Sequence, residues 1–169
     1  MIKKTNNIFL FLILFIISVS LIIVFAVEYG LGHQPCKLCI YERIPYILSI
    51  FFILELILFK RNEKITLLLI SLIFAFSAIL AFYHFGIEQG LFTEAFICES
   101  KNSSENLSKD QLLEQLKQSA ISCKDVNFKI LGFSLASINI IFSTVMSVIF
   151  LRLFKNYEKN WSKNMRGNY

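Results

Sequence analysis

Four long apolar runs divide the chain. The first covers residues 8–27 and contains no charged side chain over those 20 positions. A helix rises ~1.5 Å per residue, so this run covers the ~30 Å hydrocarbon core of a bilayer. Runs of similar character follow at about residues 41–59, 65–87 and 130–151. The pattern predicts an all-α integral membrane protein, folded as a four-helix bundle.

Polar segments between the apolar runs are predicted to be the loops that connect the helices. Two of them form loops on the same side of the membrane, at about residues 28–40 and 88–129. The length of 169 residues is within the usual size of one domain, so we expect a single membrane domain over residues 1–169.

The first run has an alternative interpretation as a cleaved signal peptide, because Lys3 and Lys4 form a basic start. Its apolar stretch is too long for a signal peptide, however. The tripeptide Ala26-Val27-Glu28 also lacks the small-x-small pattern of a cleavage site. We therefore expect the first helix to be retained.

Composition agrees with a membrane protein. Hydrophobic residues make up 56% of the chain and charged residues only 17%, which excludes an ordinary soluble domain and a disordered chain. The net charge of +5 would suggest a nucleic-acid partner in a soluble protein. Here the Lys and Arg residues lie mainly at the ends of apolar runs, so we expect a lipid bilayer as partner and no nucleic acid.

The basic residues also predict the orientation. Ten of them gather at the two chain ends and between the second and third runs: Lys3, Lys4, Lys60, Arg61, Lys64, Arg152, Lys155, Lys159, Lys163 and Arg166. The loop at 88–129 is net acidic, with seven acids and five lysines. Because basic segments stay in the cytoplasm, both termini are predicted to be cytoplasmic and both loops to face outward.

All four cysteines lie in the outward loops, Cys36 and Cys39 in the first and Cys98 and Cys123 in the second. Thiols on this side of a membrane are oxidised, so disulfide chemistry is expected. The C-x-x-C spacing of the first pair is typical of dithiols whose disulfide opens and closes. A static disulfide staple stays open as an alternative.

Two other uses of the C-x-x-C motif are disfavoured. Haem attachment needs a His directly after the second cysteine, where this chain has Ile40. A zinc site would have to recruit His33 and a cysteine of the second loop, since there is no second C-x-x-C. We expect no metal.

Residues near the motif suggest how its sulfurs are activated. Cys39 is expected near the start of the second helix, where the helix dipole favours a thiolate. Arg43 lies one turn further on and would stabilise that thiolate or the anion of a bound electron acceptor. The alternatives for Arg43 are an anchor to lipid head groups, or an ion-pair partner of Glu42 or Glu28. His84, at the outer end of the third run, has the alternative of an interfacial polar tip.

The second loop contains its own helix signal. Ser108 with Gln111 forms a capping box, and Leu107 with Leu112 a hydrophobic staple. A short amphipathic helix is predicted over about 109–120, lying on the membrane surface. Cys98 and Cys123 flank it, and both a static disulfide and exchange with the first pair remain open.

The chain resembles a known family at these positions. Residues 34–43, Gln-Pro-Cys-Lys-Leu-Cys-Ile-Tyr-Glu-Arg, are similar to the signature of the bacterial disulfide bond formation protein B family, DsbB, including its DsbI-like relatives. The similarity continues through residues 83–88, the second cysteine pair and residues 131–136. The resemblance implies a multi-pass protein of the bacterial inner membrane. Its implied activity is a quinone-dependent thiol oxidase that reoxidises a periplasmic thioredoxin-fold partner of the DsbA type.

The same resemblance implies a role for each site residue. Cys98 would be attacked by the partner's thiolate, and Cys123 would be its pairing cysteine. Cys36 and Cys39 would take the electrons from that pair and pass them to ubiquinone or menaquinone. Cys39 and Arg43 would lie at the quinone, with His84 as a neighbour. No proline lies between Cys98 and Cys123, so partner recognition is expected to differ from that of the best-known members.

Two competing classes fit less well. Proteins of the vitamin K epoxide reductase type also join C-x-x-C to a helical bundle and a quinone, but carry the motif late in the bundle. Scaffolds of the tetraspanin kind carry an adjacent Cys-Cys pair, which this chain lacks. The remaining alternative is a non-catalytic, disulfide-stapled four-helix membrane scaffold.

Overall fold

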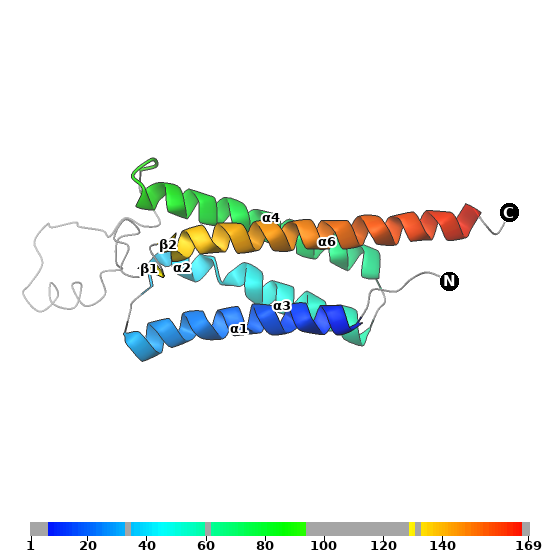
Figure 1. Cartoon of the computed structure of the whole chain (residues 1–169), viewed down its shortest axis with the longest axis horizontal. Coiled ribbons are helices and arrows are strands. Elements are labelled where there is room, and N and C mark those ends of the chain that lie inside the picture. Colours follow the sequence, from blue (N-terminus) through cyan, green and yellow to red (C-terminus); the bar gives the residue numbers. More distant parts are fainter. Residues whose placement is uncertain (1–6, 33–34, 60–61, 94–128, 131–132, 167–169) are drawn as a thin grey trace, which may run out of the picture.

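The computed structural model describes residues 7–32, 35–59, 62–93, 129–130 and 133–166. Its helices are α1 (Asn7–Leu31), α2 (Lys37–Tyr41), α3 (Ile44–Leu58), α4 (Glu63–Glu88) and α6 (Leu135–Arg166). In Figure 1, α1, α3, α4 and α6 run along a common direction, and α2 leads into α3. The helical bundle predicted from the apolar runs is confirmed.

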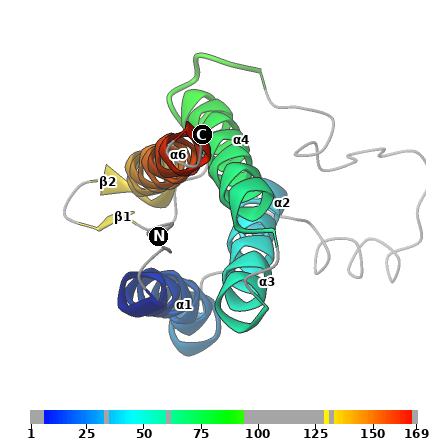
Figure 2. The same ribbon diagram turned by 90° about the vertical axis from the view of Figure 1, so that its right-hand side faces the viewer.

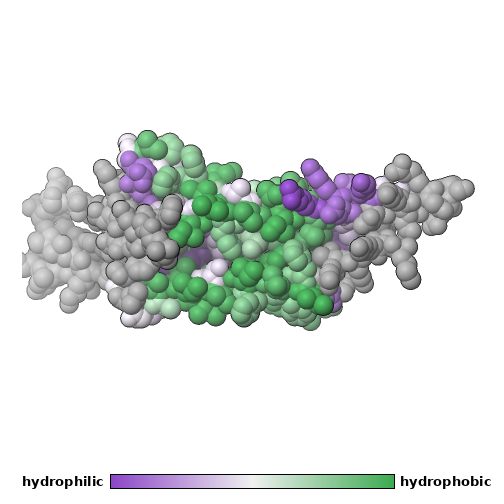
Figure 3. All heavy atoms as spheres, viewed as in Figure 1, coloured by the Kyte–Doolittle hydropathy of each residue, from purple (hydrophilic) through white to green (hydrophobic). Residues whose placement is uncertain are grey.

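Three of the described helices are long and apolar enough to cross a membrane, over Asn7–Gly30, Glu63–Glu88 and Leu135–Lys159. Apolar spheres cover the middle of the molecule in Figure 3, and polar ones gather toward its two ends. Large side chains on this outer surface include Phe15, Ile22, Phe51, Phe76, Ile79 and Ile141. A belt of this kind suits contact with lipid.

The second span departs from the expected continuous helix at 41–59. It is broken into α2 and α3, separated by a turn at Glu42 and Arg43. The cause is Pro45, which has no N–H to donate to the carbonyl of Tyr41. The chain turns instead through a bond from Arg43 N–H to the Ile40 carbonyl at 3.1 Å. At 15 residues, α3 is about 22 Å long, shorter than the membrane core.

The fourth span also differs from the expected helix at 130–151. Lys129–Ile130 and Phe133–Ser134 form a short antiparallel pair, β1 and β2, and α6 begins only at Leu135. Ser134 fixes this start because its Oγ accepts the Ser137 N–H at 3.2 Å, as an N-cap does. At its other end α6 continues to Arg166, and Leu153, Phe154 and Tyr157 still pack against the core.

The helices are arranged so that α4 lies between α6 and α3, and α3 lies against α1 (Figure 2). Small polar residues let α4 and α6 approach closely. Ser71 and Ser147 each donate a hydroxyl proton to the other's carbonyl at 3.0 Å. The apolar core beside this seam draws on all four long helices: Leu10, Ile13, Ile17, Ile53, Leu56, Leu67, Ile70, Phe74, Met146 and Phe150.

The first residue of α1 and the last of α6 lie at one end of the bundle, and α2 lies at the other (Figure 1). The helix expected at 109–120 lies outside the described residues, as do Cys98 and Cys123. The described part of the candidate site is therefore the C-x-x-C segment and the ends of the helices around it.

Candidate functional site

The two cysteines of the C-x-x-C motif lie together at one end of the bundle. Cys36 is the N-cap of α2, and its Sγ accepts the backbone N–H of Cys39 at 3.3 Å. The two sulfurs are 2.8 Å apart, with both thiols free. Cys36 is buried while Cys39 is partly exposed. The pair therefore has one sulfur inside the bundle and one toward its surface.

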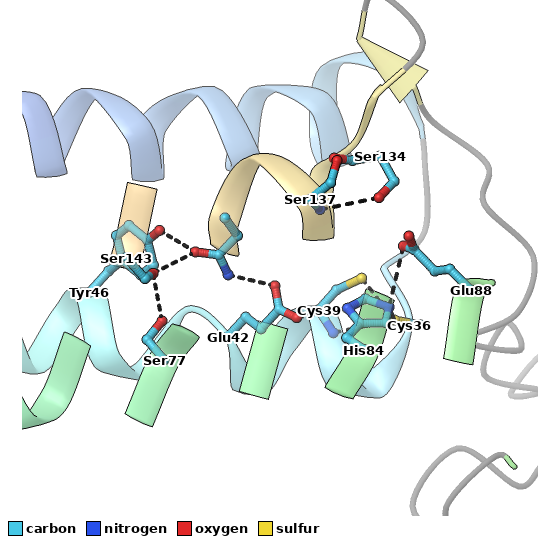
Figure 4. A network of polar contacts seen from close by, with 11 residues as sticks. Cys36, Cys39, Glu42, Tyr46, Ser77, His84, Glu88, Ser134, Ser137 and Ser143 are labelled. Atoms are coloured by element: carbon cyan, nitrogen blue, oxygen red, sulfur yellow. Dashed lines mark hydrogen bonds and ion pairs between the residues drawn. The ribbon is translucent and has the colours of Figure 1, made fainter. Parts of the chain in front are cut away.

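His84 comes from α4 and meets this pair from inside the bundle, as Figure 4 shows. Its Nε2 lies 3.5 Å from the Sγ of Cys36, and its Nδ1 lies 2.7 Å from Oε1 of Glu42. Glu88, one helical turn further along α4, places Oε1 3.7 Å from Nε2. His84 is only 3% exposed. It is therefore a buried member of a polar network rather than an interfacial tip.

The network continues into the bundle through Glu42. This residue lies in the turn between α2 and α3, and its Oε2 accepts an N–H of Asn139 from α6 at 2.7 Å. Asn139 Oδ1 accepts the hydroxyl protons of Tyr46 and of Ser143, the latter at 3.0 Å. Ser143 also contacts Ser77 of α4 at 3.0 Å. Residues of α3, α4 and α6 and of the turn between α2 and α3 thus form one hydrogen-bonded chain that ends at the Cys36 sulfur.

The surroundings of the two sulfurs shift their pKa values in opposite directions. The hydrogen bond from the Cys39 thiol, followed by the His84 interactions, lowers the pKa of Cys36 to about 5 against the opposing effect of burial. The same sulfur contact, burial and the nearby charges of Cys36 and Glu42 raise the pKa of Cys39. The sequence predicted the thiolate at Cys39, whereas the N-cap position and the His84 contact of the structure favour it at Cys36.

Arg43 points away from this network, toward α1. Its guanidinium forms an ion pair with Glu28 at 2.5 Å and lies over the ring of Phe25, 4.9 Å from the centroid. This is the pairing with Glu28 that the sequence left as an alternative. Its Nε is buried and has no hydrogen-bond partner among the described residues. The consecutive residues Glu42 and Arg43 therefore face different helices, because the helix is interrupted by the turn that they form.

Sequence reasoning missed several residues of the network, including Glu42 and Asn139, which lie between His84 and α6. Glu42 was considered only as a partner for Arg43, and Asn139 was not considered. Asn139 carried a usable signal, since an amide within a long apolar run is expected to face the bundle interior and to have a partner. Glu42 had no such signal, because its position beside the motif does not say which way it points.

Comparison with known proteins identifies the family. A sequence profile described as "Disulfide bond formation protein DsbB" matches residues 6–153. The chain belongs to the DsbB family. This membership and the three candidate spans make it a membrane protein of disulfide bond formation, with the oxidoreductase role that this implies.

One curated relative of this DsbB-family protein covers nearly its whole length. It is the uncharacterized protein RP370 of Rickettsia prowazekii (strain Madrid E), which is 33% identical over 162 residues, 94% of each chain. The similarity therefore extends over the whole bundle and both loops.

Proposed function

We propose that this DsbB-family protein is a quinone-dependent protein-disulfide oxidoreductase. It reoxidises a periplasmic thioredoxin-fold dithiol protein of the DsbA type and passes the electrons to the quinone pool of the bacterial inner membrane. The observation that carries the proposal is the placement of Cys36 and Cys39 as a close thiol pair against His84, at one end of an apolar bundle. A disulfide that served only as a staple would not need a buried histidine at its sulfur.

Thiol–disulfide exchange moves the electrons in the proposed cycle. A thiolate of the reduced partner attacks Cys98 and opens the Cys98–Cys123 disulfide; the partner leaves with its own disulfide, and this pair is left as thiols. The Cys98 and Cys123 thiols then reduce the Cys36–Cys39 disulfide by the same exchange, so the Cys98–Cys123 disulfide forms again and Cys36 and Cys39 become thiols. The final oxidant would be a membrane quinone, ubiquinone or menaquinone. It would accept two electrons and two protons as the Cys36–Cys39 disulfide forms again.

Two features of the residues around Cys39 are compatible with a bound quinone. The Nε–H of Arg43 is a buried donor without a partner among the described residues, and a quinone carbonyl oxygen is an acceptor that would satisfy it. Ile40 and Ile44, on either side of the turn, expose apolar surface of the kind that a quinone ring prefers. Cys39 and Arg43 are therefore proposed to bind the quinone. His84 is proposed to act beside it through Cys36.

The proposed orientation places both termini in the cytoplasm and the C-x-x-C segment on the periplasmic side. It is supported by the ten basic residues at the two chain ends and between the second and third apolar runs. Reporter fusions after Asn62 and Tyr169 should behave as cytoplasmic, and a fusion at Ser104 should behave as exported. An exported signal from the fusion at Tyr169 would contradict this orientation.

The activity is tested by mixing the purified protein with a reduced thioredoxin-fold dithiol protein and a soluble quinone, with oxygen excluded. We expect the quinone to be reduced as the partner becomes oxidised, and Cys39→Ser to lose both changes. A chelator is included, because Cys36, Cys39 and His84 place three ligand-type atoms within 4.8 Å. If the protein is a stapled scaffold, neither the quinone nor the partner changes.

A further inference from the structure

The hydrogen bonds that link Ser77, Ser143, Tyr46 and Asn139 lead to Glu42. Ser143 donates its proton to Asn139 Oδ1 and must therefore accept in its contact with Ser77. The Tyr46 hydroxyl donates to the same Oδ1, which fixes the orientation of the amide. Asn139 can then only donate to Glu42, from Nδ2 to Oε2 at 2.7 Å. The Glu42 carboxylate is therefore held from the α6 side by hydrogen bonds whose donors and acceptors are fixed.

A fixed carboxylate determines where His84 carries its proton. A carboxylate accepts hydrogen bonds, so the contact of 2.7 Å between Glu42 Oε1 and Nδ1 places an N–H on Nδ1. The other nitrogen, Nε2, then presents its lone pair to the Cys36 sulfur at 3.5 Å. The remaining charged group facing Nε2 is Glu88, at 3.7 Å, beyond hydrogen-bond distance.

We propose that Glu42 and Asn139 are positioning residues that hold His84 as the proton acceptor of Cys36. In the reduced pair the S–H bond of Cys36 breaks and an N–H bond forms at His84 Nε2. This leaves a thiolate beside an imidazolium, and no electrons move. When the Cys36–Cys39 disulfide forms again, the quinone would take two electrons, the proton held on His84 and the proton of the Cys39 thiol. This last step rests on the function proposed above, whereas the ionisation of Cys36 does not.

The surroundings of the two sulfurs favour this assignment over the reverse. Cys36 Sγ accepts the Cys39 backbone N–H and faces His84, while the negative charge of Glu42 acts on Cys39. The low pKa of Cys36, about 5, agrees with this geometry. Buried polar chains are costly in an apolar bundle unless every member is paired, and each member from Ser77 to His84 is paired here.

The proposal is tested by titrating the Cys36 thiolate. The full-length protein carrying Cys98→Ser and Cys123→Ser is reduced, and the ultraviolet absorbance of its thiolate is followed against pH with the oxidised form as blank. We expect a midpoint of about 5, set by Cys36. Glu42→Gln should raise the midpoint by about one to two pH units because the imidazolium loses its charge-assisted partner, and Asn139→Leu should do the same because Glu42 loses the donor that holds it. Asn139→Gln keeps the amide donor, and its midpoint should stay close to that of the parent protein.

The matched control is Thr144→Val on α6, since the Thr144 side chain is exposed and bonds only its own helix at 2.7 Å. It should leave the midpoint unchanged. An unchanged midpoint in Asn139→Leu would overturn the role of Asn139, and an unchanged midpoint in Glu42→Gln would overturn the whole arrangement. No partner or quinone enters this titration. The proposed role of Glu42 and Asn139 can therefore fail while the oxidase activity is confirmed, and the oxidase activity can fail while this role is confirmed.

Discussion

Replacing Cys123 by Ser is expected to convert Cys98 into a trap for the partner protein. When the variant is mixed with the oxidised partner, the Cys98 thiolate opens the partner's disulfide and forms a mixed disulfide, so one disulfide is exchanged for another. The sulfur that would release the partner is gone, and the mixed disulfide accumulates. Cys98→Ser should form none. The measurement is a nonreducing gel of the two variants, in which a band at the summed mass appears for Cys123→Ser alone.

Ser103→Ala is a matched control for this experiment, because it changes a serine in the same loop and leaves both cysteines in place. It should accumulate no more mixed disulfide than the unaltered protein. Equal trapping by Cys98→Ser and Cys123→Ser would show that the proposed roles of the two cysteines are wrong.

Arg43→Lys is expected to impair quinone reduction while leaving membrane insertion intact. Lysine keeps the positive charge but loses the planar fork, including the unpartnered Nε–H proposed for the quinone. Loss of one such contact in a dry site costs about 2 to 4 kcal/mol, which corresponds to roughly 30- to 1000-fold in the step it serves. The measurement is the steady-state rate of quinone reduction against quinone concentration.

The ion pair with Glu28 provides the control for Arg43. If the guanidinium serves only to hold α1 through Glu28, then Glu28→Gln should be as harmful as Arg43→Lys, and neither should change the quinone concentration at half-maximal rate. On the proposed role, Glu28→Gln keeps the Nε–H donor and should retain much more activity. A near-normal rate and half-saturation for Arg43→Lys would leave Arg43 as an anchor.

Apolar run length was sufficient to predict the helical bundle, because a membrane span depends on the count of consecutive apolar residues. The errors came from single residues with strong local effects. Pro45 lies in the first turn of α3, and the split of the second span depends also on the turn that forms before it. Ser134 set the start of α6 by capping, which an apolar count does not register.

The candidate site was predictable in its members more than in its geometry. The C-x-x-C spacing singled out Cys36 and Cys39, the position one turn further on singled out Arg43, and the family resemblance added His84 as a quinone neighbour. The direction of each side chain was not predictable, because Glu42 and Arg43 are neighbours in sequence and face different helices in the structure. The contact between His84 and Cys36 was not predictable for the same reason, because the two residues are 48 positions apart in the sequence.

The most direct test of the account is a single turnover of the Cys36–Cys39 pair with a quinone. The full-length protein carrying Cys98→Ser and Cys123→Ser is reduced, separated from the reductant and mixed with excess quinone without oxygen, and free thiols and reduced quinone are counted together. The account predicts one quinone reduced for each pair of thiols lost, and no reduction by Cys36→Ser or Cys39→Ser in the same background. Thiols that remain free while the quinone stays oxidised would contradict it.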